Sequence, residues 1–203
     1  MKKIGIMGGT FNPVHNAHLI MARYAKEQYG LDSIIFMTSG NPPHKRNIDM
    51  PDAEVRHDML KAAISGDSDF TADDYEVKQK SYSYSVNTLR YFKEIYPSDM
   101  IYFIIGEDSL ADFPKWYMPQ EILTLCTVLV YPRGEGQDVQ QKIDEIKAMY
   151  GGEIYPINSP VIGISSTEIR GRLKSGKTVR HMIPDKVLEY IEKNKLYTKD
   201  GRI

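Results

Sequence analysis

The chain of 203 residues has a single cysteine, Cys126, so no disulfide can form within it. A chain without disulfides is typical of a reducing compartment, and we expect a cytoplasmic protein. Cys126 begins the apolar run CTVLV, which predicts a buried core thiol. No stretch approaches 18 consecutive apolar residues, so we expect no transmembrane helix and no membrane partner. The N-terminus is predicted to enter a strand at once, without a signal peptide.

An excess of positive charge is also absent, because 26 Lys and Arg face 27 Asp and Glu, for a formal net charge of −1. This balance argues against a broad nucleic-acid surface, so any phosphate ligand has to be met by local positive groups. The dinucleotide fingerprint GxGxxG is missing too, since the first glycines read GIMGGT over residues 5–10. A hydride-transfer enzyme of that type is therefore not supported.

What is present is a regular alternation of strand-like and helix-like segments. Several strands are continuous apolar runs, such as Ile34-Ile35-Phe36, which is typical of a sheet covered on both faces. We therefore predict a doubly wound parallel α/β sheet, which binds ligands beyond the carboxyl ends of its strands. The expected strands are 3–7, 33–38, 71–77, 100–105, 127–131 and 153–156, and the expected helices are 16–29, 52–65, 86–96, 139–150, 166–174 and 184–195.

The most informative stretch is residues 3–22, KIGIMGGTFNPVHNAHLIMA. A buried strand stops at Gly8-Gly9, a polar turn follows, and His15 and His18 stand where a helix begins. The helix start offers unpaired N–H groups and a positive dipole end, and the glycines let the backbone approach an anion closely. Histidines that face this turn can donate hydrogen bonds to phosphate. The alternatives are a plain glycine-rich turn and an HxxH metal site, which lacks further ligands nearby.

Polar motifs also follow other predicted strands. After the second strand, Pro42 and Pro43 stiffen a loop that carries Lys45, although a surface turn with solvated charges explains these residues as well. After the fourth strand, Gly106 permits a sharp exit of the chain. Asp108 then has three open interpretations: hydrogen bonding to ribose hydroxyls, binding Mg²⁺ through water, or capping a helix.

Two predicted helix starts carry hydroxyl groups. Ser85 is predicted to be the N-cap of the helix over 86–96, whose start could hold a carboxylate or simply be capped. Ser165 and Glu168 form a capping box, with Ser166 in the first turn and Arg170 about one turn further. This arrangement suits a triphosphate, and a capped structural helix explains it equally well.

Four other residues have open or structural interpretations. Trp116, the only tryptophan, either anchors a loop in the core or offers a flat face to a ring-shaped ligand. Arg133 follows the fifth strand and either reaches a phosphate or is solvated. The helix over 52–65 is predicted to be an ordinary amphipathic helix, with Arg56 and His57 near the edge of its apolar face and His57 as a surface or capping group.

Two of these motifs resemble those of a known family. The run GGTFNPVHNAHL at residues 8–19 resembles the N-terminal signature of the HxGH nucleotidyltransferase superfamily, in the form typical of bacterial nicotinate-nucleotide adenylyltransferases. ISSTEIR at residues 164–170 is similar to the companion motif of that family. The resemblance covers nearly the whole chain. It implies one Rossmann-like nucleotidyltransferase domain over 1–203, in which a C-terminal helical part, about 163–197, completes the ATP site.

The resemblance implies adenylyl transfer from ATP to nicotinate mononucleotide, which yields deamido-NAD and pyrophosphate. The substrate phosphate would be the nucleophile, Mg²⁺ would arrive with ATP rather than in a protein metal site, and a homodimer is compatible with the sequence. The implied catalytic residues are His15, His18, Lys45 and Arg170. The implied ATP-binding residues are Gly8, Gly9, Thr10, Phe11, His18, Lys45, Gly106, Asp108, Ile164, Ser165, Ser166 and Arg170. The implied nicotinate nucleotide-binding residues are Gly8, Thr10, His15, Ser85, Trp116, Tyr117 and Arg133.

Three residues depart from the family pattern. Ala17 stands where the family usually has glycine, and its methyl group is expected to restrict slightly how close a phosphate comes. Ser85 replaces threonine in the turn implied to recognise the pyridine carboxylate, and it keeps the hydroxyl. Asn87 replaces aspartate and loses its negative charge. A sister transferase with another phosphate acceptor and a non-catalytic nucleotide-binding module are the alternative functions.

Overall fold

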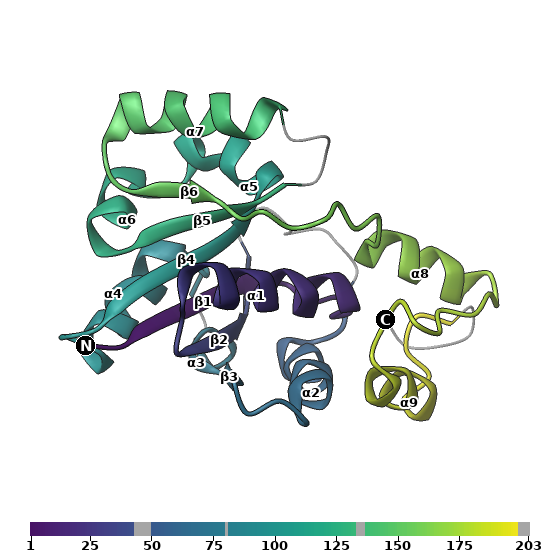
Figure 1. Ribbon diagram of the computed structural model, residues 1–203. Helices are drawn as coiled ribbons and strands as arrows, with labels where there is room; N and C mark the ends of the chain where they lie inside the picture. Colours follow the sequence, from purple (N-terminus) through teal and green to yellow (C-terminus); the bar gives the residue numbers. More distant parts are fainter. Residues whose placement is uncertain (43–49, 80, 133–136, 199–203) are drawn as a thin grey trace.

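The computed structural model describes residues 1–42, 50–79, 81–132 and 137–198 (Figure 1). These residues form one six-stranded sheet in the order β3-β2-β1-β4-β5-β6, and every strand pair is parallel. The predicted doubly wound parallel sheet is confirmed. Its strands are β1 Lys3–Gly9, β2 Ser33–Thr38, β3 Phe70–Asp73, β4 Met100–Gly106, β5 Thr127–Tyr131 and β6 Ile154–Pro156.

Helices cover both faces of this sheet (Figure 1). Because successive side chains of a strand point to opposite faces, the buried strand residues divide into two cores. Phe36, for example, packs with residues of α1, α2, α8 and α9, whereas its neighbour Ile35 packs with residues of α4, α5, α6 and α7. The helices are α1 Asn16–Tyr29, α2 Ala53–Ile64, α3 Tyr75–Lys78, α4 Ser85–Ile95, α5 Glu107–Ala111, η2 Phe113–Lys115, α6 Pro119–Leu125, α7 Gln137–Tyr150, α8 Ser166–Lys174 and α9 Asp185–Lys193.

Strand β1 lies at the point where the strand order reverses: β2 and β3 follow on one side of it, and β4, β5 and β6 on the other. It pairs with β2 on one side and with β4 on the other. The carboxyl end of β1 is Gly8-Gly9, and that of β4 is Gly106. In sheets of this order, ligands bind in the crevice outside these two strand ends. The fold therefore brings the glycine turn and the β4–α5 turn to one edge.

The strand expected over 71–77 is wrong in its second half. β3 ends at Asp73, and the one-turn helix α3 follows at Tyr75–Lys78. The cause is local: the Asp73 carboxylate accepts a hydrogen bond from the Tyr75 N–H at 2.8 Å, which turns the chain. Helices α5, η2 and α6 were not expected, because segments of three to seven residues are too short to show helical periodicity.

The surface position expected for His57 is also wrong. Its side chain is buried and lies 3.2 Å, Nδ1 to Oγ1, from the Thr38 hydroxyl at the end of β2. Arg56 beside it is 2% exposed. Helix α2 packs against β2, β3, α3 and α9, so the edges of its apolar face are covered as well. Burial lowers the pKa of the His57 imidazole, with the nearby charge of Lys61 acting in the same direction.

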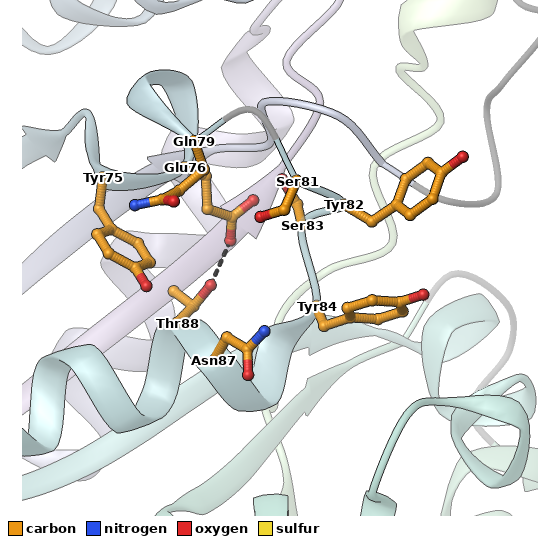
Figure 2. A pocket seen from close by; sticks show the side chains of 9 residues that line it. All are labelled: Tyr75, Glu76, Gln79, Ser81, Tyr82, Ser83, Tyr84, Asn87 and Thr88. Atoms are coloured by element: carbon orange, nitrogen blue, oxygen red, sulfur yellow. Dashed lines mark hydrogen bonds between the residues drawn. The ribbon is translucent and has the colours of Figure 1, made fainter.

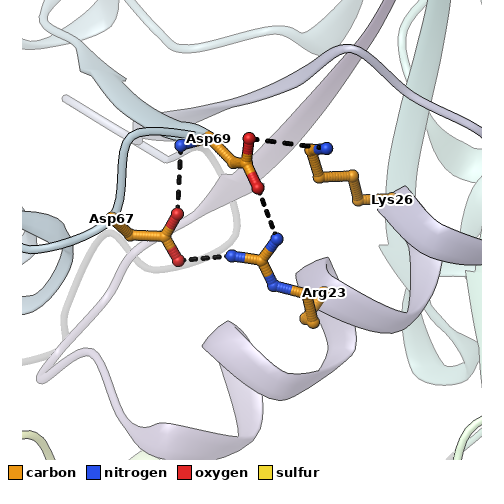
Figure 3. A network of polar contacts seen from close by, with 4 residues as sticks. All are labelled: Arg23, Lys26, Asp67 and Asp69. Carbon is orange, nitrogen blue, oxygen red and sulfur yellow. Dashed lines mark hydrogen bonds and ion pairs between the residues drawn. The ribbon is translucent and has the colours of Figure 1, made fainter.

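An ion-pair network joins α1 to the connection between α2 and β3 (Figure 3). The Arg23 guanidinium donates to Asp69 at 2.6 Å and to Asp67 at 2.5 Å, and the Lys26 ammonium lies 3.5 Å from Asp69. About a third of each of the Arg23, Asp67 and Asp69 side chains is exposed, so solvent screens these pairs and their contribution to stability is modest. None of these bonds involves the glycine turn.

The prediction of a core thiol is confirmed. Cys126 is 8% exposed and its Sγ donates to the Ile122 carbonyl at 3.3 Å. Burial raises the pKa of this thiol to about 12, so the reactive thiolate is not populated at neutral pH. Within the described part of the chain, no helix has the length and apolar character needed to cross a membrane.

Candidate active site

The two glycines of the β1–α1 turn face opposite sides of the sheet. A Cβ on Gly8 would lie 3.6 Å from the Phe103 ring, in the core of α4 to α7. A Cβ on Gly9 would lie 2.9 Å from the ring of Phe11, which belongs to the opposite core. Phe11 reaches this place through a left-handed backbone at φ 48° and is 2% exposed. Gly9 is therefore required by packing, whereas Gly8 has room for a methyl group and is exposed.

Two side chains of helix α8 donate hydrogen bonds to the turn between β1 and α1. The Arg170 guanidinium donates to the Asn12 carbonyl at 2.7 Å, and the Ser166 hydroxyl donates to the Pro13 carbonyl at 2.9 Å. The Asn12–Pro13 peptide bond between them is cis. The two motifs that the sequence singled out, 8–19 and 164–170, are thus in direct contact, although more than 140 residues separate them.

The end of the chain reaches the same turn. The Tyr197 hydroxyl, which is fully buried, donates to the Asn12 side-chain oxygen at 2.6 Å. Burial raises the pKa of this phenol, so it remains a neutral donor. The segment after α9 therefore fixes the turn as well as closing the fold.

Replacing Tyr197 by phenylalanine is expected to lower the free energy of unfolding by about 1–3 kcal/mol. The substitution leaves the buried Asn12 oxygen without its hydroxyl donor while the ring keeps its packing. Thermal unfolding of the two proteins measures the difference. Tyr190→Phe serves as the control because the Tyr190 hydroxyl has no bond to the turn. An unchanged Tm for Tyr197→Phe would show that the bond to Asn12 does not support the turn.

His15 and His18 stack on each other at the start of α1. Their ring centroids are 3.6 Å apart with an interplanar angle of 22°, and the His18 ring meets the edge of Phe11 at 5.1 Å. The His18 Nδ1 accepts a hydrogen bond from the His15 N–H at 3.2 Å. In the neutral ring the proton is then on Nε2, so His18 is set as an Nε2–H donor. This is the tautomer that a phosphate oxygen requires.

Trp116 and Tyr117, two of the residues implied to bind the pyridine nucleotide, lie on the other face of the sheet. Trp116 is half-buried and packs near Phe103 at 6.2 Å between centroids and near Phe113 at 5.3 Å. Phe103 is also the ring that Gly8 faces, so it connects the glycine turn to Trp116. Tyr117 is 54% exposed and its ring lies 5.0 Å from that of Tyr84. Trp116 thus anchors its loop, and stacking on a pyridine ring stays a prediction.

The N-cap expected at Ser85 is wrong by one residue. Tyr84, with an extended backbone, is the N-cap of α4, and Ser85 is the first helical residue. Asn87 accepts a hydrogen bond from Arg90 at 3.2 Å, and Arg90 also binds Glu121 of α6 through two bonds of 2.7 Å. Because Asn87 is uncharged, Glu121 is the one carboxylate that pairs with the Arg90 guanidinium among the described residues. Arg90 and Glu121 join α4 to α6 next to the Trp116 loop.

The turn between β4 and α5 has little room for a side chain at Gly106. A Cβ on Gly106 would lie 3.0 Å from the Tyr131 ring, so glycine is favoured there. Helix α5 begins directly at Glu107, whose carboxylate pairs with Lys142 of α7 at 3.1 Å. Asp108 lies in the first turn of α5 and is exposed at the strand-end edge. The helix-capping interpretation of Asp108 is therefore wrong, because Gly106 is the N-cap.

The predicted capping box at α8 is confirmed at its N-cap. The Ser165 hydroxyl accepts a hydrogen bond from the Glu168 N–H at 3.2 Å. Ile164, just before it, is half-buried against the α1 and α2 core. Two implied site residues, Lys45 and Arg133, lie outside the described residues.

Ala17 does not face the turn. Its side chain is 0% exposed and belongs to the core with α2 and α8, so the expected restriction on phosphate approach is wrong. The reason is helix geometry, because the position between the two histidines points toward the sheet. Ala17→Gly is therefore expected to lower stability by about 1 kcal/mol through lost helix propensity, with unchanged kcat. Chemical denaturation together with steady-state kinetics tests this, and a gain in kcat would contradict it.

Sequence reasoning missed Arg56 and Tyr197, which both bond to the turn. Arg56 donates from Nη1 to the Thr10 carbonyl at 2.7 Å. One signal was available: Arg56 precedes Met59 and Leu60 by three and four residues, so a charged side chain stands on the buried stripe of α2. For Tyr197 no local signal exists, since its partner is 185 residues away.

No three His, Cys, Asp or Glu side chains of the described residues come together as a metal site.

Comparison with known proteins identifies the class. The cytidylyltransferase-like family model matches residues 6–172, and the chain is a nucleotidyltransferase. A probable nicotinate-nucleotide adenylyltransferase of Clostridium botulinum (strain Okra / Type B1) is 41% identical over 195 residues, which cover 95% of this chain and 97% of the relative. One of Caldicellulosiruptor saccharolyticus is 41% identical over 196 residues, covering 96% and 98%. The chain belongs to the nicotinate-nucleotide adenylyltransferase family.

The fold is similar to that of a solved structure. The structure of Plasmodium falciparum nicotinic acid mononucleotide adenylyltransferase complexed with NaAD superposes with a TM-score of 0.79 at 22% identity, covering 97% of this chain and 98% of that one. At this identity the likeness establishes the fold alone. It agrees with the parallel sheet derived from the sequence.

Proposed function

We propose that this enzyme transfers the adenylyl group of ATP to nicotinate mononucleotide, giving deamido-NAD and pyrophosphate. One observation carries the proposal: two sets of residues meet at Gly8-Gly9 from opposite faces of the sheet. Phe11 and His18 lie on the α1 face, while Phe103 and the Trp116 loop lie on the other. Two nucleotides bound on the two faces would bring their phosphates together at the turn between them.

The ATP side of this proposal is the face covered by α1 and α8. Its phosphates would meet the turn, His18, the start of α8 and Lys45, and its ribose would meet Asp108. The C-terminal part, about 163–197, completes this side, which the bonds from Arg170 and Ser166 to the turn support. Mg²⁺ would be held mainly by ATP oxygens and would offset their charge. The residues assigned to ATP are Gly8, Gly9, Thr10, Phe11, His18, Lys45, Gly106, Asp108, Ile164, Ser165, Ser166 and Arg170.

The nicotinate nucleotide occupies the α4 and α6 face. The start of α4 at Ser85 suits the pyridine carboxylate, because a helix N-terminus favours a negative group. The Trp116 ring would cover the pyridine, and Arg133 would contact the phosphate. The residues assigned to this nucleotide are Gly8, Thr10, His15, Ser85, Trp116, Tyr117 and Arg133.

The reaction needs no enzyme nucleophile. The 5′-phosphate of the mononucleotide attacks the α-phosphorus of ATP in line, one P–O bond forms, and the bond to pyrophosphate breaks. Cys126 is buried with a raised pKa, which supports the exclusion of a thiol nucleophile. Catalysis then consists of positioning and of stabilising charge by His15, His18, Lys45 and Arg170. We place the reaction in the cytoplasm, with no nucleic acid involved, and either a monomer or a homodimer is compatible with it.

The test is pyrophosphate release from Mg-ATP with nicotinate mononucleotide, run beside the same assay with nicotinamide mononucleotide. We expect rapid release and a dinucleotide product with the acid and much slower release with the amide. Comparable rates would keep the reaction but overturn the proposed carboxylate recognition at Ser85. Absence of release with both would overturn the proposed function.

A further inference from the structure

Arg56 is a buried cation on helix α2. Its guanidinium makes hydrogen bonds only to backbone carbonyls among the described residues: Pro51 at 3.0 Å, Thr10 at 2.7 Å and Gly40 at 3.2 Å. The residue is 2% exposed. Burial lowers the pKa of the guanidinium, which reflects the cost of keeping a cation away from water. A simple core position would be filled more favourably by an apolar side chain.

The three carbonyls belong to three separate segments. Thr10 is in the turn after β1, Gly40 follows the end of β2, and Pro51 precedes α2. The strands β1 and β2 are neighbours, with Gly9 in register with Thr38. One planar guanidinium therefore spans the carboxyl ends of two adjacent strands. A lysine ammonium cannot do this in the same way, because it is a point charge without the rigid fork.

Gly40 is held from its other side by α3. A Cβ on Gly40 would lie 2.0 Å from the Glu76 carbonyl oxygen, so no larger residue fits without movement. The Glu76 side chain is itself buried, and its carboxylate accepts a hydrogen bond from the Thr88 hydroxyl at 2.5 Å (Figure 2). Burial raises the pKa of this carboxyl group. Gly40 is thus fixed between Arg56 and the backbone of α3.

A small cavity of about 30 Å³ lies beside Glu76, and serine and tyrosine residues of the segment before α4 line it (Figure 2). The Glu76–Thr88 hydrogen bond at this cavity joins α3 to α4.

We propose that Arg56 is a positioning residue for adenylyl transfer, which fixes the turn at Thr10 relative to the segment at Gly40. The inference rests on the proposed function, because the turn then carries the reacting phosphates. A displacement of about 1 Å between reacting groups can cost about 10²-fold in rate. Arg56 acts through the two backbone segments and touches no reacting atom.

The experiment compares Arg56→Lys with the wild-type enzyme in the assay with nicotinate mononucleotide. We expect kcat to fall by about 10²-fold per folded molecule, while KM for both substrates changes by less than about threefold. A purely structural role would lower Tm and leave the kcat of the folded protein unchanged. Arg23→Lys is the matched control, because its guanidinium pairs with Asp67 and Asp69 away from the turn (Figure 3), and its kcat is expected to equal that of the wild type.

Gly40→Ala disturbs the other end of the same connection while Arg56 stays in place. Gly40→Ala is expected to lower kcat as Arg56→Lys does. If Arg56→Lys does not fold, the kcat of Gly40→Ala tests the positioning role in its place. The double variant should lose less than the product of the two single effects, because both act on one contact. Wild-type kcat in both single variants would overturn this inference alone. An inactive wild-type enzyme would overturn the proposed function and the inference with it.

Discussion

Replacing His18 by alanine is expected to lower kcat by about 10²- to 10³-fold, with little change in the affinity for nicotinate mononucleotide. The His15 N–H donates to His18 Nδ1, which in the neutral ring leaves the proton on Nε2, so the ring is a preorganised donor for charge that develops on the transferring phosphoryl group. Losing one such donor costs about 3–4 kcal/mol of barrier. Steady-state kinetics with calorimetric titration of the mononucleotide gives both quantities.

Two further variants separate the donor from the hydrogen bond within the helix start. His18→Asn keeps an acceptor near the place of Nδ1, which can still bind the His15 N–H, but it lacks the distal donor. His18→Gln places an amide donor near Nε2. We expect the asparagine variant to be as slow as alanine and the glutamine variant to recover part of kcat. Equal losses in kcat and in mononucleotide affinity would contradict a role confined to the transition state.

Gly8→Ala is expected to leave stability unchanged and to lower kcat/KM by about 10²-fold. The structure has room for the methyl group, since the nearest atom of Phe103 lies 3.6 Å from the Cβ position. Gly8 is exposed at the edge where the two nucleotides are proposed to meet, so the methyl group would stand in the path of a phosphate. Thermal unfolding and steady-state kinetics measure the two effects on one preparation.

Gly9→Ala provides the contrasting case. Its Cβ would lie 2.9 Å from the Phe11 ring, so this variant is expected to lose stability as well as activity. If Gly8→Ala turned out fully active, the close approach of a phosphate to Gly8 would be excluded. The pair therefore separates a glycine needed by a ligand from a glycine needed by packing.

The sequence was sufficient to predict the sheet, because its buried strands are continuous apolar runs and its turns are marked by glycine and proline. Helices 16–29 and 166–174 agree with α1 and α8 in both bounds. These segments are long, and their ends carry local signals. The strand prediction failed at residues 74–77, because an aspartate at the end of β3 redirects the chain into a single helical turn.

The side chains that hydrogen-bond to the turn between β1 and α1 could not be predicted in the same way. Arg56, Arg170 and Tyr197 each bond to an atom of residues 10–12, from positions 46 to 185 residues away. Such contacts exist only once the sheet has brought the segments together. Arg170 was expected to bind ATP phosphate, and its bond to the Asn12 carbonyl adds a structural contact that no local pattern indicates.

The departures from the family pattern have local explanations. Ala17 faces the core, Asn87 accepts a hydrogen bond from Arg90, and Ser85 keeps a hydroxyl at the first turn of α4. Of the three, Ser85 is the one that the proposed recognition of the pyridine carboxylate uses.

The most direct test of the account is the stereochemistry of transfer from ATP that carries sulfur on one α-phosphate oxygen. A phosphate nucleophile that attacks in line, with no covalent enzyme intermediate, inverts the configuration at that phosphorus. We predict complete inversion in the dinucleotide formed from nicotinate mononucleotide. Retention would require two displacements and an adenylylated enzyme group, and it would contradict a mechanism that rests on positioning alone.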